Sequence, residues 1–318
     1  MKKEFKTLNE QIEILKNKGL VINDEEYAKL VLFLENYFFL NGYRHLYMKT
    51  SVDKRYIEGT TFEELYSLFL FDRTFRNIIF KNILIIENNV KSIISYQLSL
   101  KYGYKERDYL TPKNFTTNKE KAKQVNDILK KMKRQINVNA TAHSATAHYV
   151  NNYGFIPLWV LVKVLSFGIV GELYSILKKE DQMGIAELYN LDVEVLSNYL
   201  TILSNYRNLC AHEDIVYENK TQRRIEDNKY HKLLNIPIMD DEYIYGKNDL
   251  FALVIIMKQM LSQEEFNNMI EEIKHNLDNL KINLQTIEID KVMDRMGFPT
   301  NYHEIKNINW GEFNEGKR

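Results

Sequence analysis

The sequence predicts an all-α protein with negligible sheet, on three observations. Only 4 Pro and 12 Gly occur in 318 residues, so breakers of regular structure are sparse. Helix-favouring residues such as Leu, Lys and Glu are frequent, and apolar side chains recur at helical spacing through long stretches. Hydrophobic residues make up 45% of the chain, which is enough for a substantial core.

The first two expected helices are of moderate length. Thr7 and Glu10 form a capping-box pattern ahead of the first helix, and Gly19 follows its end. A second helix is expected from residue 24 to residue 40, before Gly42.

The third helix is expected to be much longer. It opens at Thr61, with Glu64 three residues later as a second capping pattern. From there to Gly103 there is no Pro or Gly, which predicts one very long helix or two abutting helices. The apolar stripe of this segment contains Leu68, Phe75, Ile79, Ile86 and Val90.

The middle of the chain is more polar. Residues 119–134 hold seven basic and two acidic residues. This composition is typical of a surface that contacts phosphates and equally of a solvated helix face. Residues 137–147 lack any periodicity, which predicts a loop.

Helices resume at Pro157, which suits the first turn of a helix that carries Trp159. Gly168 and Gly171 indicate either a tight packing point or a break. A further helix is expected over residues 192–211.

The last third of the chain begins with residues 213–247, which are polar and irregular. Two more helices are expected after them, one opening at Ser262 with Glu265 as its capping box. We expect a helical core over residues 1–230 and a C-terminal helical region, residues 231–318, packed on that core.

Charge and cysteine content limit the class of protein. With 43 basic and 43 acidic residues the net charge is zero, so a nucleic-acid site must be a local patch. The single cysteine, Cys210, excludes an intramolecular disulfide and fits a reducing compartment. The N-terminus lacks an apolar signal core, and charges interrupt the most apolar stretch, residues 69–90. We therefore expect a cytoplasmic protein that does not enter a membrane.

Candidate chemistry is concentrated in the string Arg207-Asn208-Leu209-Cys210-Ala211-His212. The imidazole of His212 suits acid or base work because its unperturbed pKa lies near neutrality. The planar guanidinium of Arg207 suits a phosphate, and Asn208 can orient either group by hydrogen bonding. The sequence contains no metal-ligand cluster, so neither a metal nor another cofactor is expected.

Each of these residues also has a structural interpretation. A lone histidine at a helix end is commonly a C-cap that interacts with the helix dipole. Cys210 lies on the apolar stripe, which favours a core residue over a nucleophile. Asn208 and His212 share a helix face that is either solvated or lines an RNA groove, together with Ser197, Thr201 and Asn205.

Asp72 is unusual because it falls within the apolar stripe of the long helix. A carboxylate that points at a core needs a partner. Arg76, four residues on, is the simplest candidate for that partner, and Arg207, which is distant in the sequence, is a second candidate. Glu87 is another possible partner for Arg207. The set is either a structural ion pair or a support for the candidate site.

Several sequence strings occur along the chain in a fixed order and spacing. In these strings the chain resembles the Abi family of phage-resistance proteins, the AbiD/AbiF-like group within the HEPN superfamily. The strings are TLNEQIEILKNKGLVI at 7–22, NYFFLNGYRHLY at 36–47, FDRTFRNIIF at 71–80, Glu87 in IIEN, IPLWVLVKVLSFG at 156–168, YRNLCAH at 206–212 and MGFP at 296–299.

This resemblance implies a multi-helix HEPN-like bundle, here with a C-terminal helical extension. It also implies RNA as substrate or ligand, a homodimer, and growth arrest during phage infection. Some relatives are toxins restrained by a small structured RNA. Many members continue the motif as His-His with a basic-aromatic tail, whereas this chain reads His212-Glu213-Asp214-Ile215.

The expected function is a metal-independent endoribonuclease toxin. His212 would act as general acid or base, Arg207 as phosphate clamp and Asn208 as positioner, which yields a 2′,3′-cyclic phosphate and a 5′-hydroxyl. Two alternatives stay open: a non-catalytic RNA-binding protein that acts by sequestration, and a helical interaction protein without RNA. Supporting roles are expected for Asp72, Arg76 and Glu87, and RNA contacts for Lys130, Lys131, Lys133 and Arg134.

The spacing of the motif bears on assembly. On an ideal helix of about 100° per residue, Arg207 and His212 point about 140° apart. Either the helix ends near Ala211 and the chain turns His212 back, or a second subunit completes the site. We favour a two-fold dimer, in which two copies of this helix end meet.

Overall fold

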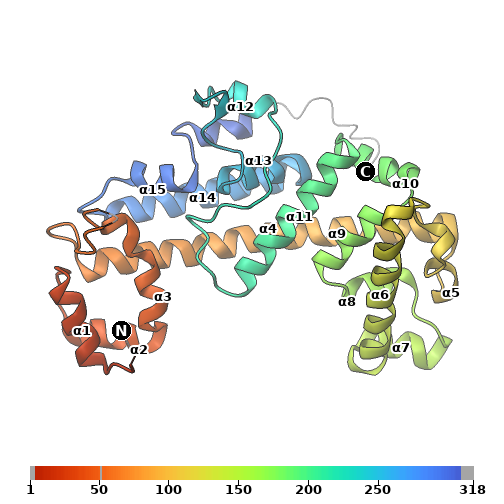
Figure 1. The fold of residues 1–318 in the computed structure, drawn as a ribbon, viewed down its shortest axis with the longest axis horizontal. Coiled ribbons are helices and arrows are strands. Elements are labelled where there is room, and N and C mark those ends of the chain that lie inside the picture. Colours follow the sequence, from red (N-terminus) through yellow and green to blue (C-terminus); the bar gives the residue numbers. More distant parts are fainter. Residues whose placement is uncertain (1–3, 51, 309–318) are drawn as a thin grey trace.

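The computed structural model describes residues 4–50 and 52–308. The chain is all-α, as predicted: the strands found in this part are β1 (Ile238–Met239) and β2 (Glu242–Tyr243), which form one small antiparallel hairpin. The elements are arranged along a single long helix (Figure 1).

That helix is α4 (Phe62–Tyr102), an unbroken run of 41 residues. The side chain of Thr61 accepts a hydrogen bond from the backbone N–H of Glu64 at its start, and Gly103 ends it with a φ of 95°. Of the two predicted arrangements, the single helix is therefore the one formed. Other helices cover it along its length, so its buried residues exceed one stripe (Figure 1).

The N-terminal elements lie at one end of α4 (Figure 1). They are α1 (Leu8–Asn17), α2 (Glu25–Glu35), α3 (Tyr37–Gly42) and the 3-10 helix η1 (Tyr43–Tyr47). The Thr7–Glu10 capping box opens α1 as predicted. The single helix predicted over residues 24–40 is wrong. Asn36 breaks it with a φ of 67°, and its side chain accepts a hydrogen bond from Phe38 N–H to cap α3.

The opposite end of α4 carries the middle of the chain (Figure 1). Here α6 (Ala122–Ala142) and α7 (Ser144–Tyr153) follow three short elements, α5 (Glu106–Tyr109), η2 (Pro112–Asn114) and η3 (Lys119–Lys121). The loop predicted over residues 137–147 is wrong, because only His143 separates the two helices. Residues 137–144 are largely exposed, so a helix there needs no apolar stripe and leaves no periodicity.

Next come α8 (Leu158–Val164), α9 (Phe167–Ile176), α10 (Lys179–Ala186), η4 (Glu187–Tyr189) and α11 (Val193–Ala211). Gly168 and Gly171 lie inside α9 and face α11. A Cβ added at Gly168 would lie 3.2 Å from the hydroxyl of Ser204. The glycines therefore mark a tight packing point, not a break, and α11 crosses α4 obliquely beside α9 (Figure 1).

The C-terminal third is irregular up to residue 249 apart from β1, β2 and α12 (Lys229–Leu233). It then forms α13 (Leu250–Met260), α14 (Gln263–Asn283), α15 (Ile289–Met296) and η5 (Tyr302–Asn307), so the prediction of two helices was wrong by one. α13 is buried on nearly every side and so lacks a polar face with helical period. The Ser262–Glu265 capping box opens α14 as predicted, and α14 runs along α4 (Figure 1).

Across residues 4–50 and 52–308, no helix combines the length and the apolar character that crossing a membrane requires.

Candidate active site

The last turn of α11 presents the Arg-Asn-x-x-x-His string. Leu196, Leu200 and Leu203 are buried on the stripe that faces the core, and Cys210 continues it. Burial raises the pKa of the Cys210 thiol to about 12, so the sulfur stays protonated and packs as an apolar group.

His212 is the C-cap residue of α11. Its backbone N–H donates to the carbonyl of Asn208 at 3.0 Å, and the chain then reverses at Glu213, which has a φ of 57°. The imidazole itself is exposed and has no hydrogen bond to another described residue. The backbone of His212 therefore caps α11, while its side chain stays available for other contacts.

A pocket of about 330 Å³ opens beside this histidine. One wall belongs to α11 and contains Asn205, Asn208 and His212, and the facing wall is the segment 219–222. We call it the His212 pocket. Three residues of the predicted polar face of α11 thus line the pocket, whereas Ser197 and Thr201 do not.

Arg207 lies in different surroundings. Its Nε is 3.6 Å from a carboxylate oxygen of Glu87 on α4, and its guanidinium carbon is 5.8 Å from the centre of the Phe80 ring. Glu87 also pairs with Lys91 at 2.6 Å. Arg207 does not line the His212 pocket. One chain therefore does not turn both proposed catalytic side chains into this cavity.

Asp72 is fully buried and accepts four hydrogen bonds. Two come from side chains, the Tyr43 hydroxyl at 2.6 Å and Arg76 Nη1 at 2.7 Å. Two come from backbone N–H groups, of Val216 at 3.2 Å and Tyr217 at 2.7 Å. Burial raises the pKa of the Asp72 carboxyl, and these donors oppose that shift.

Arg76 extends the same network toward the histidine, since its Nη1 donates to the carbonyl of Asp214 at 3.4 Å. Of the two partners considered for Asp72, Arg76 is the one found. The network ties α4 and η1 to the segment 214–217, just beyond His212, and so sets where the chain goes after α11. Sequence reasoning missed Tyr43, although it lies in one of the strings that carry the resemblance.

A second cavity, of about 750 Å³, lies on the other side of this turn. Its walls include the exposed rings of Phe33, Phe38 and Phe39, the side chains of Arg44 and Arg73, and residues 213–215. Asp214 lines both cavities. Arg73 is neutralised by Glu35, with a nitrogen–oxygen distance of 2.9 Å.

The four basic residues predicted to contact RNA are exposed on α6. Lys131 forms an ion pair with Glu172 at 2.6 Å, and Lys130, Lys133 and Arg134 have no such partner among the described residues. None of the four lines either cavity. They form a separate surface at the opposite end of α4 from α1–α3 (Figure 1).

The described residues contain no group of three or more His, Cys, Asp or Glu side chains that could hold a metal ion.

The fold and site define a class of protein. It is an all-α chain in which a core helix ends in Arg207 and an exposed histidine, and a buried acidic residue of a long central helix holds the segment that follows. A family model for Abi-like proteins matches residues 31–218, more than half of the chain. The protein therefore belongs to the Abi-like family, which associates it with abortive-infection defence against phage. No curated protein and no solved structure matches the chain.

The matched region contains the whole network from Tyr43 to Tyr217 and all of α11. It stops before the far wall of the His212 pocket, residues 219–222.

Proposed function

We propose that this protein is a metal-independent endoribonuclease whose activity arrests growth during phage infection. The observation that carries the proposal is the environment of His212: its imidazole and Asn208 line one pocket, and the segment that follows, at Val216 and Tyr217, is held by the buried carboxylate of Asp72. A histidine in such a setting is suited to proton transfer near neutral pH.

The reaction needs only groups of the protein and the RNA. The ribose 2′-oxygen loses its proton to a base and attacks the adjacent phosphorus, while the bond from phosphorus to the 5′-oxygen breaks. An acid protonates that leaving oxygen, which gives a 2′,3′-cyclic phosphate and a 5′-hydroxyl. His212 serves as one of these proton-transfer groups, and Asn208 orients the phosphate or the imidazole.

Arg207 supplies the positive charge for the phosphorane-like transition state. Because Arg207 packs toward Glu87 while His212 lines its pocket, we propose that a two-fold dimer completes each site with residues of both subunits.

A second candidate is an RNA-binding protein that acts by sequestration without cleavage. The carboxylate of Glu87 beside Arg207 favours it, because this negative charge competes with a phosphate for the guanidinium. Glu213, which stands where many relatives have a second histidine, adds another negative charge next to His212.

One experiment separates the two candidates. Bacteria express wild type, His212→Ala or the control His275→Ala, and their growth and RNA ends are measured. The control removes an exposed histidine of α14. We expect wild type and the control to arrest growth and to leave cyclic phosphate ends, in the presence of EDTA as well. His212→Ala should do neither. Undiminished cleavage by His212→Ala refutes the assignment, and arrest by wild type without RNA breaks supports sequestration.

A further inference from the structure

The His212 pocket contains more hydrogen-bonding groups than proton transfer requires. Residues with amide side chains line it on both walls: Asn205 and Asn208 of α11, and Asn219 and Gln222 of the facing segment. None of these amide groups hydrogen bonds to another described residue. Each therefore keeps two N–H donors and a carbonyl acceptor available for a ligand.

The size of the pocket fits one small polar ligand. Its volume of about 330 Å³ lies at the lower end of the range for small-molecule sites. Leu209 supplies an apolar surface, and Lys220, also in the lining, has no ion-pair partner among the described residues. An apolar surface, several amides and one cation match the three parts of a nucleotide: the face of the base, its edge and its phosphate.

The facing wall is held in place, which selective recognition requires. The Tyr206 hydroxyl donates to the carbonyl of Asn219 at 3.4 Å. Three hydrogen bonds join Thr221 and Asn248. Thr221 N–H and Oγ1 donate to Asn248 O at 2.8 and 3.3 Å, and Asn248 Nδ2 donates to Thr221 O at 3.2 Å.

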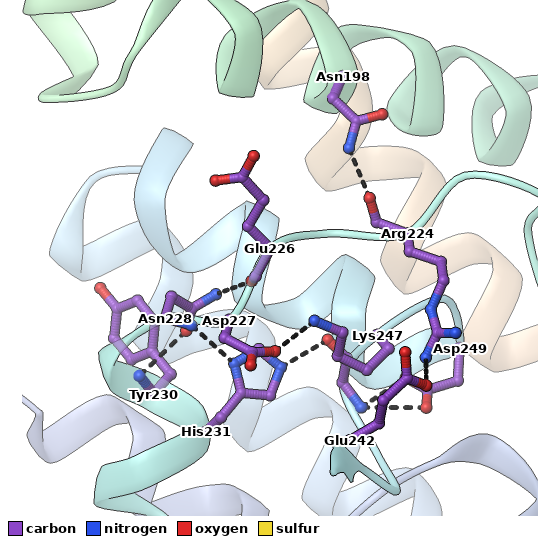
Figure 2. A network of polar contacts seen from close by, with 11 residues as sticks. Asn198, Arg224, Glu226, Asp227, Asn228, Tyr230, His231, Glu242, Lys247 and Asp249 are labelled. Carbon is purple, nitrogen blue, oxygen red and sulfur yellow. Dashed lines mark hydrogen bonds and ion pairs between the residues drawn. The ribbon is translucent and has the colours of Figure 1, made fainter. Parts of the chain in front are cut away.

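The continuation of this wall is fastened further along the chain (Figure 2). Asn198 of α11 donates to the carbonyl of Arg224 at 2.7 Å, and the Arg224 side chain pairs with Glu242 at 2.6 Å. Lys247 pairs with Asp227, and its backbone carbonyl accepts from Ile225 N–H at 2.8 Å. The segment that carries Asn219 and Gln222 is thus tied to α11 on one side and to residues 247–248 on the other.

We propose that the His212 pocket binds the base of the nucleotide next to the scissile phosphate, and that Asn219 and Gln222 determine which base is accepted. This inference rests on the proposed function. Lys220 holds a phosphate of the same nucleotide. The side-chain oxygens of Asn219 and Gln222 accept from an exocyclic amino group, which favours adenine or cytosine over uracil.

The first test maps cleavage positions on an RNA of random sequence by sequencing the new ends. Wild type is expected to cut beside adenine or cytosine at least about tenfold more often than beside uracil. The double variant Asn219→Ala/Gln222→Ala should still cut but lose that preference. Asn307→Ala, which removes an exposed amide far along the chain, is the control and should match wild type. Wild-type cleavage without preference, or a preference that survives in the double variant, overturns the pocket assignment and leaves the ribonuclease standing.

The second test measures binding, so that it does not depend on cleavage. Fluorescence anisotropy follows 2′-O-methyl trinucleotides with adenine, cytosine or uracil at the centre. We expect the double variant to equalise their affinities, and Lys220→Ala to weaken all three by a similar factor. If wild type cuts no RNA, the ribonuclease proposal fails while base-dependent binding still supports the pocket. Equal wild-type affinities for the three probes overturn the proposal that this pocket selects the base.

Discussion

The buried carboxylate of Asp72 accepts a hydrogen bond from the backbone N–H of Tyr217 at 2.7 Å, across 145 positions of sequence. This contact and its neighbour at Val216 hold the segment that follows His212. The position of the histidine at the end of α11 therefore depends on a residue of α4.

Asp72→Asn should reduce RNA cleavage by about 100-fold, because a misplacement of about 1 Å at a catalytic group costs on that order. The change keeps the size of the side chain but removes the charge that Arg76 and two backbone N–H groups bind. Cleavage rates and circular dichroism are the measurements, with the exposed Asp127→Asn of α6 as control. A folded Asp72→Asn protein with the wild-type rate would show that the network serves stability alone.

Mixing Arg207→Ala with His212→Ala chains should restore activity that neither has alone. If each site combines residues of two subunits, random pairing makes half of the dimers mixed, each mixed dimer carries one intact site, and about a quarter of wild-type activity returns. Activity is measured after the two chains are unfolded and refolded together. A chain that is monomeric at the assay concentration and fully active would rule out the shared site.

Charge reversal of Lys130, Lys131, Lys133 and Arg134 should weaken RNA binding and flatten its dependence on salt, since each phosphate contact releases counterions. The salt slope is measured by titration at several ionic strengths. Lys274 and Lys281, exposed on α14, are reversed as a control and should leave the slope unchanged. Lys131 is expected to contribute least, because Glu172 already neutralises it.

Gly297→Ala should destabilise the protein by more than Gly154→Ala does. Both glycines end helices in the left-handed region, with φ of 75° and 73°. A Cβ at Gly154 meets nothing within 4 Å, so only the backbone cost of about 1 kcal/mol applies. A Cβ at Gly297 would lie 2.2 Å from the carboxyl carbon of Asp249, which must move. Free energies of unfolding in urea decide the comparison, and equal losses would contradict it.

Stability should fall in mild acid because of His231. This histidine is fully buried; Asn228 N–H donates to its Nδ1 at 3.2 Å, and its Nε2 donates to the carbonyl of Gly246 at 2.8 Å (Figure 2). Burial lowers its pKa below the ordinary 6.5. The unfolded chain therefore binds a proton first, so the stability present above that value is lost as the pH falls toward the lowered pKa.

His231→Gln removes this proton uptake. The difference in unfolding free energy between wild type and His231→Gln should shrink as the pH falls from about 7.5 to about 5. Parallel stability curves over that range would show that His231 does not titrate on unfolding.

What the sequence alone determined is local or periodic. The Thr7–Glu10 and Ser262–Glu265 caps follow from contacts between residues three positions apart, and the absence of Pro and Gly predicts helix throughout the segment that forms α4. The Arg207–His212 string could be singled out because its residue types carry a recognisable chemistry. The need of Asp72 for a partner followed from its place among apolar residues, and Arg76 lay one turn away.

The tertiary structure alone decided the features that depend on distant segments. Asn36 breaks a helix that its neighbours would have continued, and the C-terminal part forms the three helices α13, α14 and α15 where two were predicted. The second wall of the His212 pocket comes from a polar segment without periodicity, whose position is set by hydrogen bonds to Tyr206 and Asn248. Such contacts join residues far apart in the chain, and no pattern of neighbouring side chains encodes them.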